Sequence, residues 1–415
     1  MCEKNHRTVY GIDLGSSYSA IAFVNEDGWA EVVSNVEGDR ITASAVFVEP
    51  DEMAGKRSVV VGKVAKELAS TDPDHFIDFV KPHMGDVAWK REIERITWTP
   101  EMVSAAIVRK LVQGVEYCGE KVHDVVITCP VGFSSAQRQA TITAGKLAGL
   151  NVVGLIDDTT AVALSYSKTF PEKSKTVMVY DLGGSAFEVA VVNINKGSIE
   201  VVCSGGNSHL GGKDWDDALA RYLAGKFAKE NNVPESYLWA DLETSTELRI
   251  GAERTKCFLT RRPEAAQKIF YSGIKSHVKV TKETFEILTK PLLYETVALT
   301  EKMLNVAAEK GVTNIDECLL AGGSSRMPQI REMIVARFGS RIGKEPYFYD
   351  DGGTVVKGAA IYGYGKNVSR LAQDRVGGGS SETEEFDMVA GVCKDLLTPA
   401  KIENAKKIMS NMEIS

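Results

Sequence analysis

Residues 9–25 read VYGIDLGSSYSAIAFVN and residues 177–193 read VMVYDLGGSAFEVAVVN, so the chain contains one short turn twice. Each copy is an apolar run, an Asp-Leu-Gly turn and a second apolar run rich in β-branched residues, which is the pattern of a β-hairpin. Asp13 and Asp181 occupy equivalent places at the tips of these hairpins. A carboxylate beside bare backbone N–H groups suits a magnesium ion and the phosphates that it bridges. The two tips predict two related lobes that face one nucleotide. The alternative, that each aspartate only stabilises its turn, is disfavoured by the duplication.

The composition limits the class of protein. At 415 residues the chain can bury more than one core, so two or three domains are expected. A net charge of −7 provides no positive field for nucleic acid or for an anionic membrane. No apolar run approaches the ~20 residues of a membrane span, and no signal-peptide core follows the N-terminus. The seven cysteines are scattered and form no C-x-x-C pair, which favours a reducing, cytoplasmic location. We therefore expect neither a nucleic-acid nor a membrane partner.

Strand and helix patterns alternate along the chain and predict α/β layers. A Thr-Pro cap opens a helix over residues 100–118, a buried strand follows at 122–129, and a Ser-x-x-Gln capping box opens a helix over 135–148. The second half repeats this plan, with a hairpin at 177–203 and a strand, glycine turn and helix over 318–338. The fold class is thus predicted as α/β.

Six motifs follow one another in a single order. They are DLGSS, CPVGFSSAQRQAT, DLGGSAF, HLGGKDWD, GAERTK and GGSSRMP. In this order they resemble the ATPase domain of the seventy-kilodalton heat-shock (DnaK-type) chaperone family, over about residues 8–363. The resemblance implies an actin-like (ribonuclease H-like) ATPase fold, with two duplicated lobes and a nucleotide cleft between them. It also implies a divergent member that lacks the peptide-binding domain of the family.

On this basis we divide the chain into four parts. Lobe I of the actin-like ATPase domain is expected over residues 1–175 and lobe II over residues 176–367. A flexible linker of Gly, Ser and acidic residues is expected over 368–390. Residues 391–415 are expected to form a short tail, in which GVCKDLLTP resembles the apolar interdomain linker of the family and residues 399–412 favour a helix. Such a tail is too short for a core of its own, so it could dock on its own ATPase domain or on a partner.

The resemblance assigns roles residue by residue. The catalytic residues that it implies are Asp13, Lys81, Asp158, Asp181 and Glu188, with Asp13 and Asp181 near Mg²⁺ through its waters. The nucleotide-binding residues that it implies are Gly15, Ser16, Ser17, Tyr18, Gly183, Gly184, Ser185, Gly211, Gly212, Glu253, Lys256, Thr260, Gly322, Gly323, Ser324 and Arg326. From the residues alone, Lys81 could be an ordinary solvated lysine, Glu253 and Lys256 a solvated i,i+3 ion pair, and Gly322 part of a generic turn.

Several positions depart from the family pattern. Ser185 stands for a glycine and adds a side chain where the backbone should approach phosphate closely. Glu188 stands for an aspartate, and Asp158 stands for a glutamate, one methylene shorter. A misplacement of about an ångström can cost on the order of a hundredfold in rate. Cys257 replaces an arginine that stacks on adenine, while Arg326 keeps the opposite one. We therefore expect slow hydrolysis.

The function expected from the sequence is a chaperone-related protein that binds ATP or ADP with Mg²⁺. It would hydrolyse ATP slowly and couple nucleotide state to lobe closure and to protein partners or co-chaperones, without a peptide clamp of its own. The alternative is a nucleotide-sensing scaffold that binds ATP with little or no hydrolysis. A small-molecule kinase of the same superfamily is a third option, for which the sequence offers no acceptor site.

Overall fold

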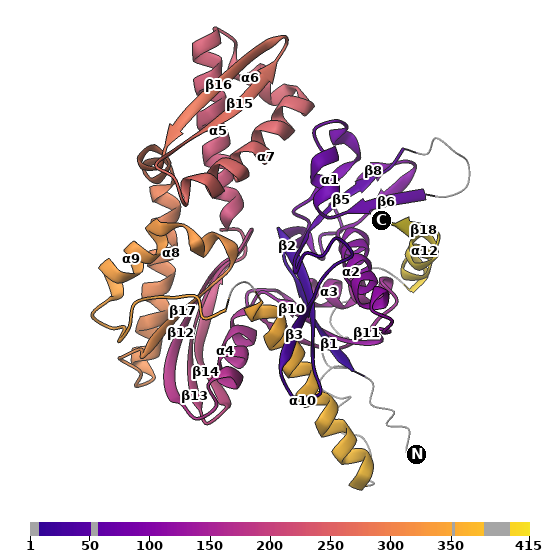
Figure 1. Ribbon diagram of the computed structural model, residues 1–415, viewed down its shortest axis with the longest axis vertical. Helices are drawn as coiled ribbons and strands as arrows, with labels where there is room; N and C mark the ends of the chain where they lie inside the picture. Colours follow the sequence, from indigo (N-terminus) through magenta and orange to yellow (C-terminus); the bar gives the residue numbers. More distant parts are fainter. Residues whose placement is uncertain (1–7, 51–56, 351–352, 377–398) are drawn as a thin grey trace.

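The computed structural model describes residues 8–50, 57–350, 353–376 and 399–415. They form two lobes, seen at the right and left of Figure 1, and each lobe contains one large sheet. Helices α4 (Asp158–Thr169) and α10 (Thr354–Val376) lie between the two sheets and pack against each other. Because α10 covers the first sheet and α4 covers the second, this helix pair joins the lobes.

The sheet of the first lobe has the strand order β11-β10-β1-β2-β3, with β4 beside β2. Its strands are β1 (Val9–Leu14), β2 (Tyr18–Val24), β3 (Ala30–Val33), β4 (Thr42–Ala43), β10 (Asp124–Cys129) and β11 (Asn151–Asp157). Helices α2 (Pro100–Tyr117) and α3 (Ser135–Leu147) cover one face, and α10 covers the other. Alternate residues of a strand point to opposite faces, so Ile12 joins the core under α2, whereas Ala20 and Ala22 pack with Ala360 of α10.

The sheet of the second lobe has the order β14-β13-β12-β17. Its strands are β12 (Ser174–Leu182), β13 (Phe187–Asn195), β14 (Ser198–Asn207) and β17 (Glu317–Ala321). The helices near it are α5 (Gly212–Asn231), α8 (Lys282–Glu309) and α9 (Pro328–Phe338), with the short η3 (Gly323–Arg326) after β17. Tyr180 and Phe187 lie in one core with Met303 of α8, while Val179 and Ala190 lie in another with Val162 of α4.

The two sheets share a four-stranded core of the same topology. In each, a hairpin (β1–β2 or β12–β13) continues to an antiparallel third strand, and a later strand pairs in parallel with the first strand of the hairpin. That later strand is β10 in one lobe and β17 in the other, and a helix follows each of them. The duplicated turn in the sequence therefore marks a duplicated lobe.

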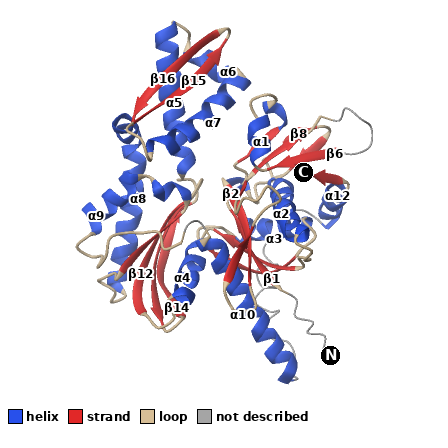
Figure 2. Ribbon diagram, in the orientation of Figure 1, coloured by secondary structure: helices blue, strands red, loops and turns tan. Residues whose placement is uncertain are grey.

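Smaller units extend both lobes at the top of Figure 2. In the first lobe they are β5 (Ala45–Val48), β6 (Arg57–Val61), α1 (Lys63–Leu68), η1 (Pro73–His75), β7 (Phe76–Asp78), η2 (Lys81–His83), β8 (Arg91–Ile93) and β9 (Ile96–Trp98). In the second lobe they are α6 (Glu235–Ala240), α7 (Leu242–Leu259), β15 (Glu264–Tyr271) and β16 (Ile274–Thr281). The tail adds α12 (Pro399–Ser410) and β18 (Met412–Ile414), which pairs with β6 of the first lobe.

Most local predictions agree with these elements. The helices expected at 100–118 and 135–148 are α2 and α3, and α3 carries the expected capping box. Two boundaries differ. Helix α10 continues to Val376, past residue 367, where we expected the linker to begin. The tail helix ends at Ser410, because the residues after it find a partner strand, β6, that is remote in sequence. Residues 377–398 lie outside the described residues, and the division between lobes I and II stays a prediction.

Candidate functional site

The first hairpin tip is anchored by hydrogen bonds from two neighbouring segments. Thr128 Oγ1, on β10, donates to Asp13 Oδ1 at 3.2 Å. Ser44 Oγ donates to the carbonyl of Gly15 at 2.7 Å. Gly15 itself is required by the turn, since an added Cβ would fall 2.1 Å from the carbonyl oxygen of Tyr18. The sequence analysis missed Ser44 and Thr128, which lie outside the repeated stretch.

The second tip sets two carboxylates side by side. Asp181, on β12, stands opposite Glu188, on β13, in the register of the hairpin. Gly183 N–H donates to the carbonyl of Ala186 at 2.9 Å and closes the turn. Gly322, after β17, has a positive φ of 76°, and a Cβ there would fall 2.4 Å from Asp181 Oδ1. The third glycine turn therefore packs directly against the carboxylate of the second tip.

The glycine loops of the two lobes touch each other. Ser16 Oγ and Ser185 Oγ share a hydrogen bond, although these residues belong to opposite lobes. A Cβ on Gly184 would fall 2.1 Å from Ser17 Oγ, so only glycine permits this approach. The structure thus brings together the two loops that we expected to bind phosphate. It also gives the serine that departs from the family pattern a bond that glycine could not make.

The start of α5 joins the second loop. Gly212 N–H donates to the carbonyl of Gly183 at 2.9 Å, and Lys213 N–H donates to that of Gly184 at 2.9 Å. A Cβ on Gly211 would fall 2.6 Å from the carbonyl oxygen of Gly184. Main-chain hydrogen bonds therefore fix the start of α5 to this loop.

One lysine, Lys81, lies within electrostatic range of four carboxylates. Lys81 Nζ lies 3.3 Å from Asp158 Oδ2, at the start of α4. Burial and the charge of Asp158, partly offset by Lys81, raise the pKa of Asp13 to about 6. Burial and the charges of Asp158 and Asp13 raise the pKa of Asp181 to about 8. The pKa of Glu188 is raised by burial and by the charges of Asp158 and Asp181. The cluster has an excess of buried negative charge, which a cation would relieve.

The carboxylates near Lys81 are better suited to bind a cation through its water molecules than to ligate it directly. Among the described residues, Asp158 Oδ1 and Glu188 Oε2 are buried oxygens that accept no hydrogen bond. Within the same residues, no group of three His, Cys, Asp or Glu side chains converges closely enough to ligate a metal. Magnesium keeps several of its waters and binds proteins through one or two carboxylates together with substrate phosphates. The contacts of Asp13 and Asp181 with Mg²⁺ through water stay a prediction.

Glu188 reaches the first lobe, which the sequence analysis did not foresee. Its Oε1 accepts a hydrogen bond from Val131 N–H at 2.5 Å. Arg138 binds the same loop, donating to the carbonyl of Val131 at 3.3 Å, and to Asp157 Oδ1 at 2.7 Å. The longer side chain that replaces an aspartate therefore links the second tip to the loop after β10.

Glu253 and Lys256, expected to bind ribose, have separate partners. Glu253 Oε2 lies 2.8 Å from Lys66 Nζ of α1, across the lobes. Lys256 Nζ donates to the carbonyl of Gly212 and to the Asp216 carboxylate, both at 2.9 Å. The alternative of a solvated i,i+3 pair is therefore not what the structure shows. Lys66 and Asp216 escaped the sequence analysis because neither lies beside its partner in the chain.

The expected adenine contacts are less closely defined. Thr260 Oγ1 donates to the carbonyl of Lys256 at 3.2 Å, within its own helix end. The Arg326 guanidinium lies 4.5 Å from the centre of the Phe348 ring, and Cys257 is an exposed free thiol. Ser324 is buried close to the start of α5, because a Cβ on Gly212 would fall 2.1 Å from its Oγ. For Tyr18, Gly323 and these residues, contact with a nucleotide stays a prediction.

Comparisons with known proteins agree with this architecture. The family model described as "Hsp70 protein" matches residues 9–364. The "Chaperone protein DnaK" of Thermotoga petrophila is 38% identical over 355 residues, which are 83% of this chain and 57% of that protein. The protein of the same name from Thermosipho africanus is 37% identical over 339 residues, covering 80% and 55%. The chain thus spans little more than half the length of these relatives.

No helix in the part of the chain that the structure describes is long and apolar enough to cross a membrane. The expected actin-like α/β fold, with duplicated lobes, is confirmed by the two equivalent sheets and by the extent of the family match. By that match, the chain belongs to the Hsp70 protein family.

Proposed function

We propose that the chain binds Mg·ATP and Mg·ADP between its lobes, hydrolyses ATP slowly, and couples nucleotide state to lobe closure and to the binding of protein partners. One observation carries the proposal: the glycine loops of the two lobes touch, and the carboxylates of both hairpin tips lie within electrostatic range of the same lysine, Lys81. The relatives that the chain resembles are named as chaperones, so a chaperone-related role with co-chaperone partners is part of the proposal.

In this scheme the residues position charge. Backbone N–H groups of the two loops and the hydroxyls of Ser16 and Ser17 bind phosphate oxygens. Lys81 would offset the negative charge that develops as the γ-phosphoryl group leaves, and Asp158 and Glu188 would orient the attacking water and help to hold the metal. Magnesium supplies neutralisation of the phosphate oxygens. Phosphoryl transfer depends mainly on positioning and electrostatics of this kind.

Three contacts support a slow reaction and favour a second candidate function. Asp158 Oδ2 is paired with Lys81, and Glu188 Oε1 is bound by Val131 N–H, so neither carboxylate is wholly free to orient water. The hydrogen bond between Ser16 and Ser185 also occupies the proton of one of the two hydroxyls, which can donate to a phosphate only after that bond opens. A nucleotide-sensing scaffold that binds ATP with little or no hydrolysis is therefore the second candidate.

Calorimetry followed by a rate measurement tests the proposal. Titration with ATP and ADP, with and without Mg²⁺, should show binding that is tighter with the metal. Single-turnover hydrolysis of bound ATP should be slow in the wild type and slower in Lys81→Ala and Asp181→Asn. Binding with no hydrolysis above that of the variants would select the scaffold. No binding of either nucleotide would refute both functions.

A further inference from the structure

Residues 399–415 fold back onto the first lobe and extend its small sheet (Figure 1). Strand β18 lies parallel to β6, with Glu413 opposite Ser58. Val61 N–H donates to the carbonyl of Ser415 at 3.0 Å, and Ser415 N–H donates to that of Val59 at 3.0 Å. The segment is therefore bound by main-chain hydrogen bonds to the edge of β6, which is how an extended peptide adds to a sheet.

Helix α2 holds the same segment from the other side. The buried side chains of the segment are those of Ala405, Met409, Met412 and Ile414, and all four belong to the hydrophobic core of the first lobe. Met409 is completely buried. On α2, Arg109 donates to the carbonyl of Met409, and Gln113 Nε2 donates to that of Ile414 at 2.8 Å. Apolar burial and polar contacts thus fix both the helix and the strand.

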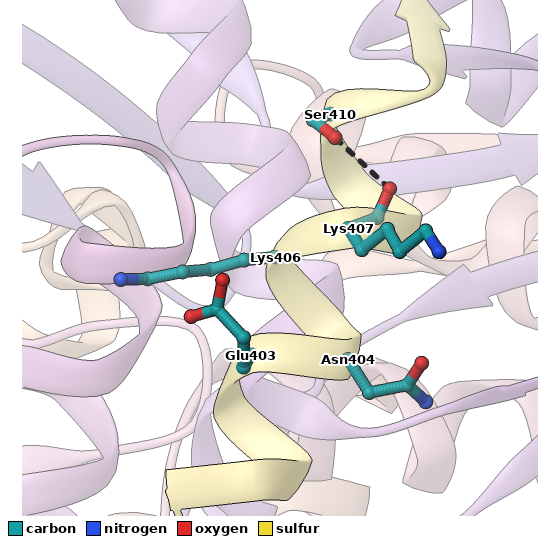
Figure 3. A pocket seen from close by; sticks show the side chains of 5 residues that line it. All are labelled: Glu403, Asn404, Lys406, Lys407 and Ser410. Carbon is teal, nitrogen blue, oxygen red and sulfur yellow. Dashed lines mark hydrogen bonds between the residues drawn. The ribbon is translucent and has the colours of Figure 1, made fainter.

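The opposite face of α12 is polar and exposed. Figure 3 shows this face, with the side chains of Glu403, Asn404, Lys406 and Lys407 directed away from the helix axis. Ser410 Oγ donates to the carbonyl of Lys407 at 3.0 Å. A segment of 17 residues, 399–415, with one apolar face cannot form a core by itself. Its structure depends on the first lobe, so it can be present on the lobe or released from it.

The surface that binds residues 399–415 spans two parts of the first lobe. Helix α12 contacts α2 and α3, which cover the large sheet, whereas β18 contacts β6 of the small sheet. Docking therefore ties the small sheet to the body of the lobe.

The strand that binds the segment is connected by one residue to the helix that contacts the second lobe. Strand β6 ends at Val61, Gly62 turns the chain with a positive φ of 104°, and α1 begins at Lys63. Lys66 of α1 is the residue that pairs with Glu253 of α7 across the lobes at 2.8 Å. The strand that binds the tail is thus joined directly to the helix that carries the ion pair across the lobes.

We propose that residues 399–415 are a tethered regulator of nucleotide release. When the segment is docked, it holds β6 and α1 in the position in which Lys66 pairs with Glu253. When the segment is undocked, the two lobes separate faster and the nucleotide is released sooner. The regulation rests on the proposed function, since it needs a nucleotide in the cleft. The docking itself does not.

Two measurements on the full chain test the proposal. Hydrogen exchange of the β6 amides reports docking without nucleotide, and stopped-flow release of a fluorescent ADP analogue reports the cleft. Met409→Asp places a charge in a fully buried site and should undock the segment. We expect the β6 amides to exchange faster. We also expect release of the analogue to accelerate about 3–10-fold, because undocking weakens a partly exposed ion pair and the packing around it. Asn404→Asp, on the exposed face of the same helix, should change neither.

A double-mutant cycle tests the path through α1. In Lys66→Ala the cross-lobe pair is already absent, so adding Met409→Asp should accelerate release no further. Gln113→Ala removes one hydrogen bond to Ile414 and should shift both readouts in the same direction by less, which covers the case in which Met409→Asp fails to fold. Oxidation of the double variant Ser58→Cys with Glu413→Cys should yield a cross-linked monomer. When Met409→Asp is added to these two substitutions, the cross-link should restore the wild-type release rate. The single variant Ser58→Cys is the control for the native thiols.

The outcomes separate the claims. Lost β6 protection with unchanged release would overturn the coupling, and unchanged protection in Met409→Asp would overturn the docking. A cross-linked dimer would show that the segment comes from a second copy and would overturn docking within one chain. If the wild type releases no analogue because it binds none, the proposed function fails and the regulation fails with it, while hydrogen exchange still reports on docking.

Discussion

The two hairpin tips carry the same Asp-Leu-Gly turn in different surroundings. At the first tip, Asp13 accepts a hydrogen bond from Thr128 and stands opposite Ala20 in the hairpin register. At the second tip, Asp181 stands opposite another carboxylate, Glu188. Burial and the charge of Asp158 raise the pKa of Asp13 to about 6, an increase that Lys81 and the hydrogen bond from Thr128 oppose. Burial and the charges of Asp158 and Asp13 raise the pKa of Asp181 to about 8, against Lys81 alone. The repeated turn supplies a carboxylate twice, whereas the neighbours of each turn decide how strongly that carboxylate needs a cation.

Lys81 is the cation that both tips share, so its removal should have the largest effect. It lowers the pKa of both aspartates, against the larger opposing effect of burial. We expect Lys81→Ala to slow single-turnover hydrolysis by about 10²–10³-fold, as expected for loss of a group that stabilises developing charge. Lys63→Ala, at an exposed lysine of α1, is the control and should leave the rate unchanged. Equal rates in the two variants would remove Lys81 from the mechanism.

The pH dependence of stability should separate the tips. Because its pKa is raised from 3.8 to about 8, folded Asp181 retains a proton that the unfolded chain has lost, so stability falls as pH rises through that window. Asp181→Asn should remove this loss and, without metal or nucleotide, stabilise the protein at pH 8 by on the order of 2 kcal/mol. Asp13→Asn should show a smaller gain, complete by about pH 6 because the pKa of Asp13 is only about 6. Urea denaturation in EDTA across this range measures both variants, and equal gains would contradict the comparison.

The sequence predicts contacts between residues that are close together in the chain, but not contacts between residues that are far apart in it. The tips, the capped helices and the glycine turns are local patterns, so the lobes and the two tip aspartates could be anticipated from them, whereas Lys81, Asp158 and Glu188 follow from the family resemblance. The contacts of Glu188 with Val131, of Lys66 with Glu253 and of β18 with β6 join segments remote in sequence. A local pattern has no period or cap that specifies such partners. The sequence therefore predicts a catalytic role for Glu188 but not its contact with Val131, and it predicts a helix to residue 412 but no strand after it.

Ser17 and Ser185 occupy equivalent places after the two tips, and exchanging each for glycine should have opposite effects. Ser185→Gly removes the hydrogen bond to Ser16, frees that hydroxyl and lets the backbone approach phosphate. We expect the affinity for Mg·ATP to rise about 3–10-fold, the scale of one net hydrogen bond. Ser17→Gly should lower it, because a phosphate donor is lost. Calorimetry measures both; weaker binding in Ser185→Gly would instead make the Ser185 hydroxyl a phosphate ligand in its own right.

The smallest expected effect belongs to the aromatic ring of Tyr18, at a position where the second tip has an alanine. Tyr18 aligns with Ala186 of the second tip, and Lys66 Nζ lies 5.3 Å from the centre of its ring. A cation–π contact at a partly exposed site contributes about 0.5–1 kcal/mol. Tyr18→Ala should therefore weaken the hold on Lys66 and speed release of a fluorescent ADP analogue by about 2–5-fold, while Tyr117→Ala, at an exposed ring on the far end of α2, should not. Tyr18→Ala could instead speed release equally in the wild type and in Lys66→Ala. In that case the ring acts on the nucleotide itself, and the two tips differ in ligand contact rather than in their effect on the cross-lobe pair.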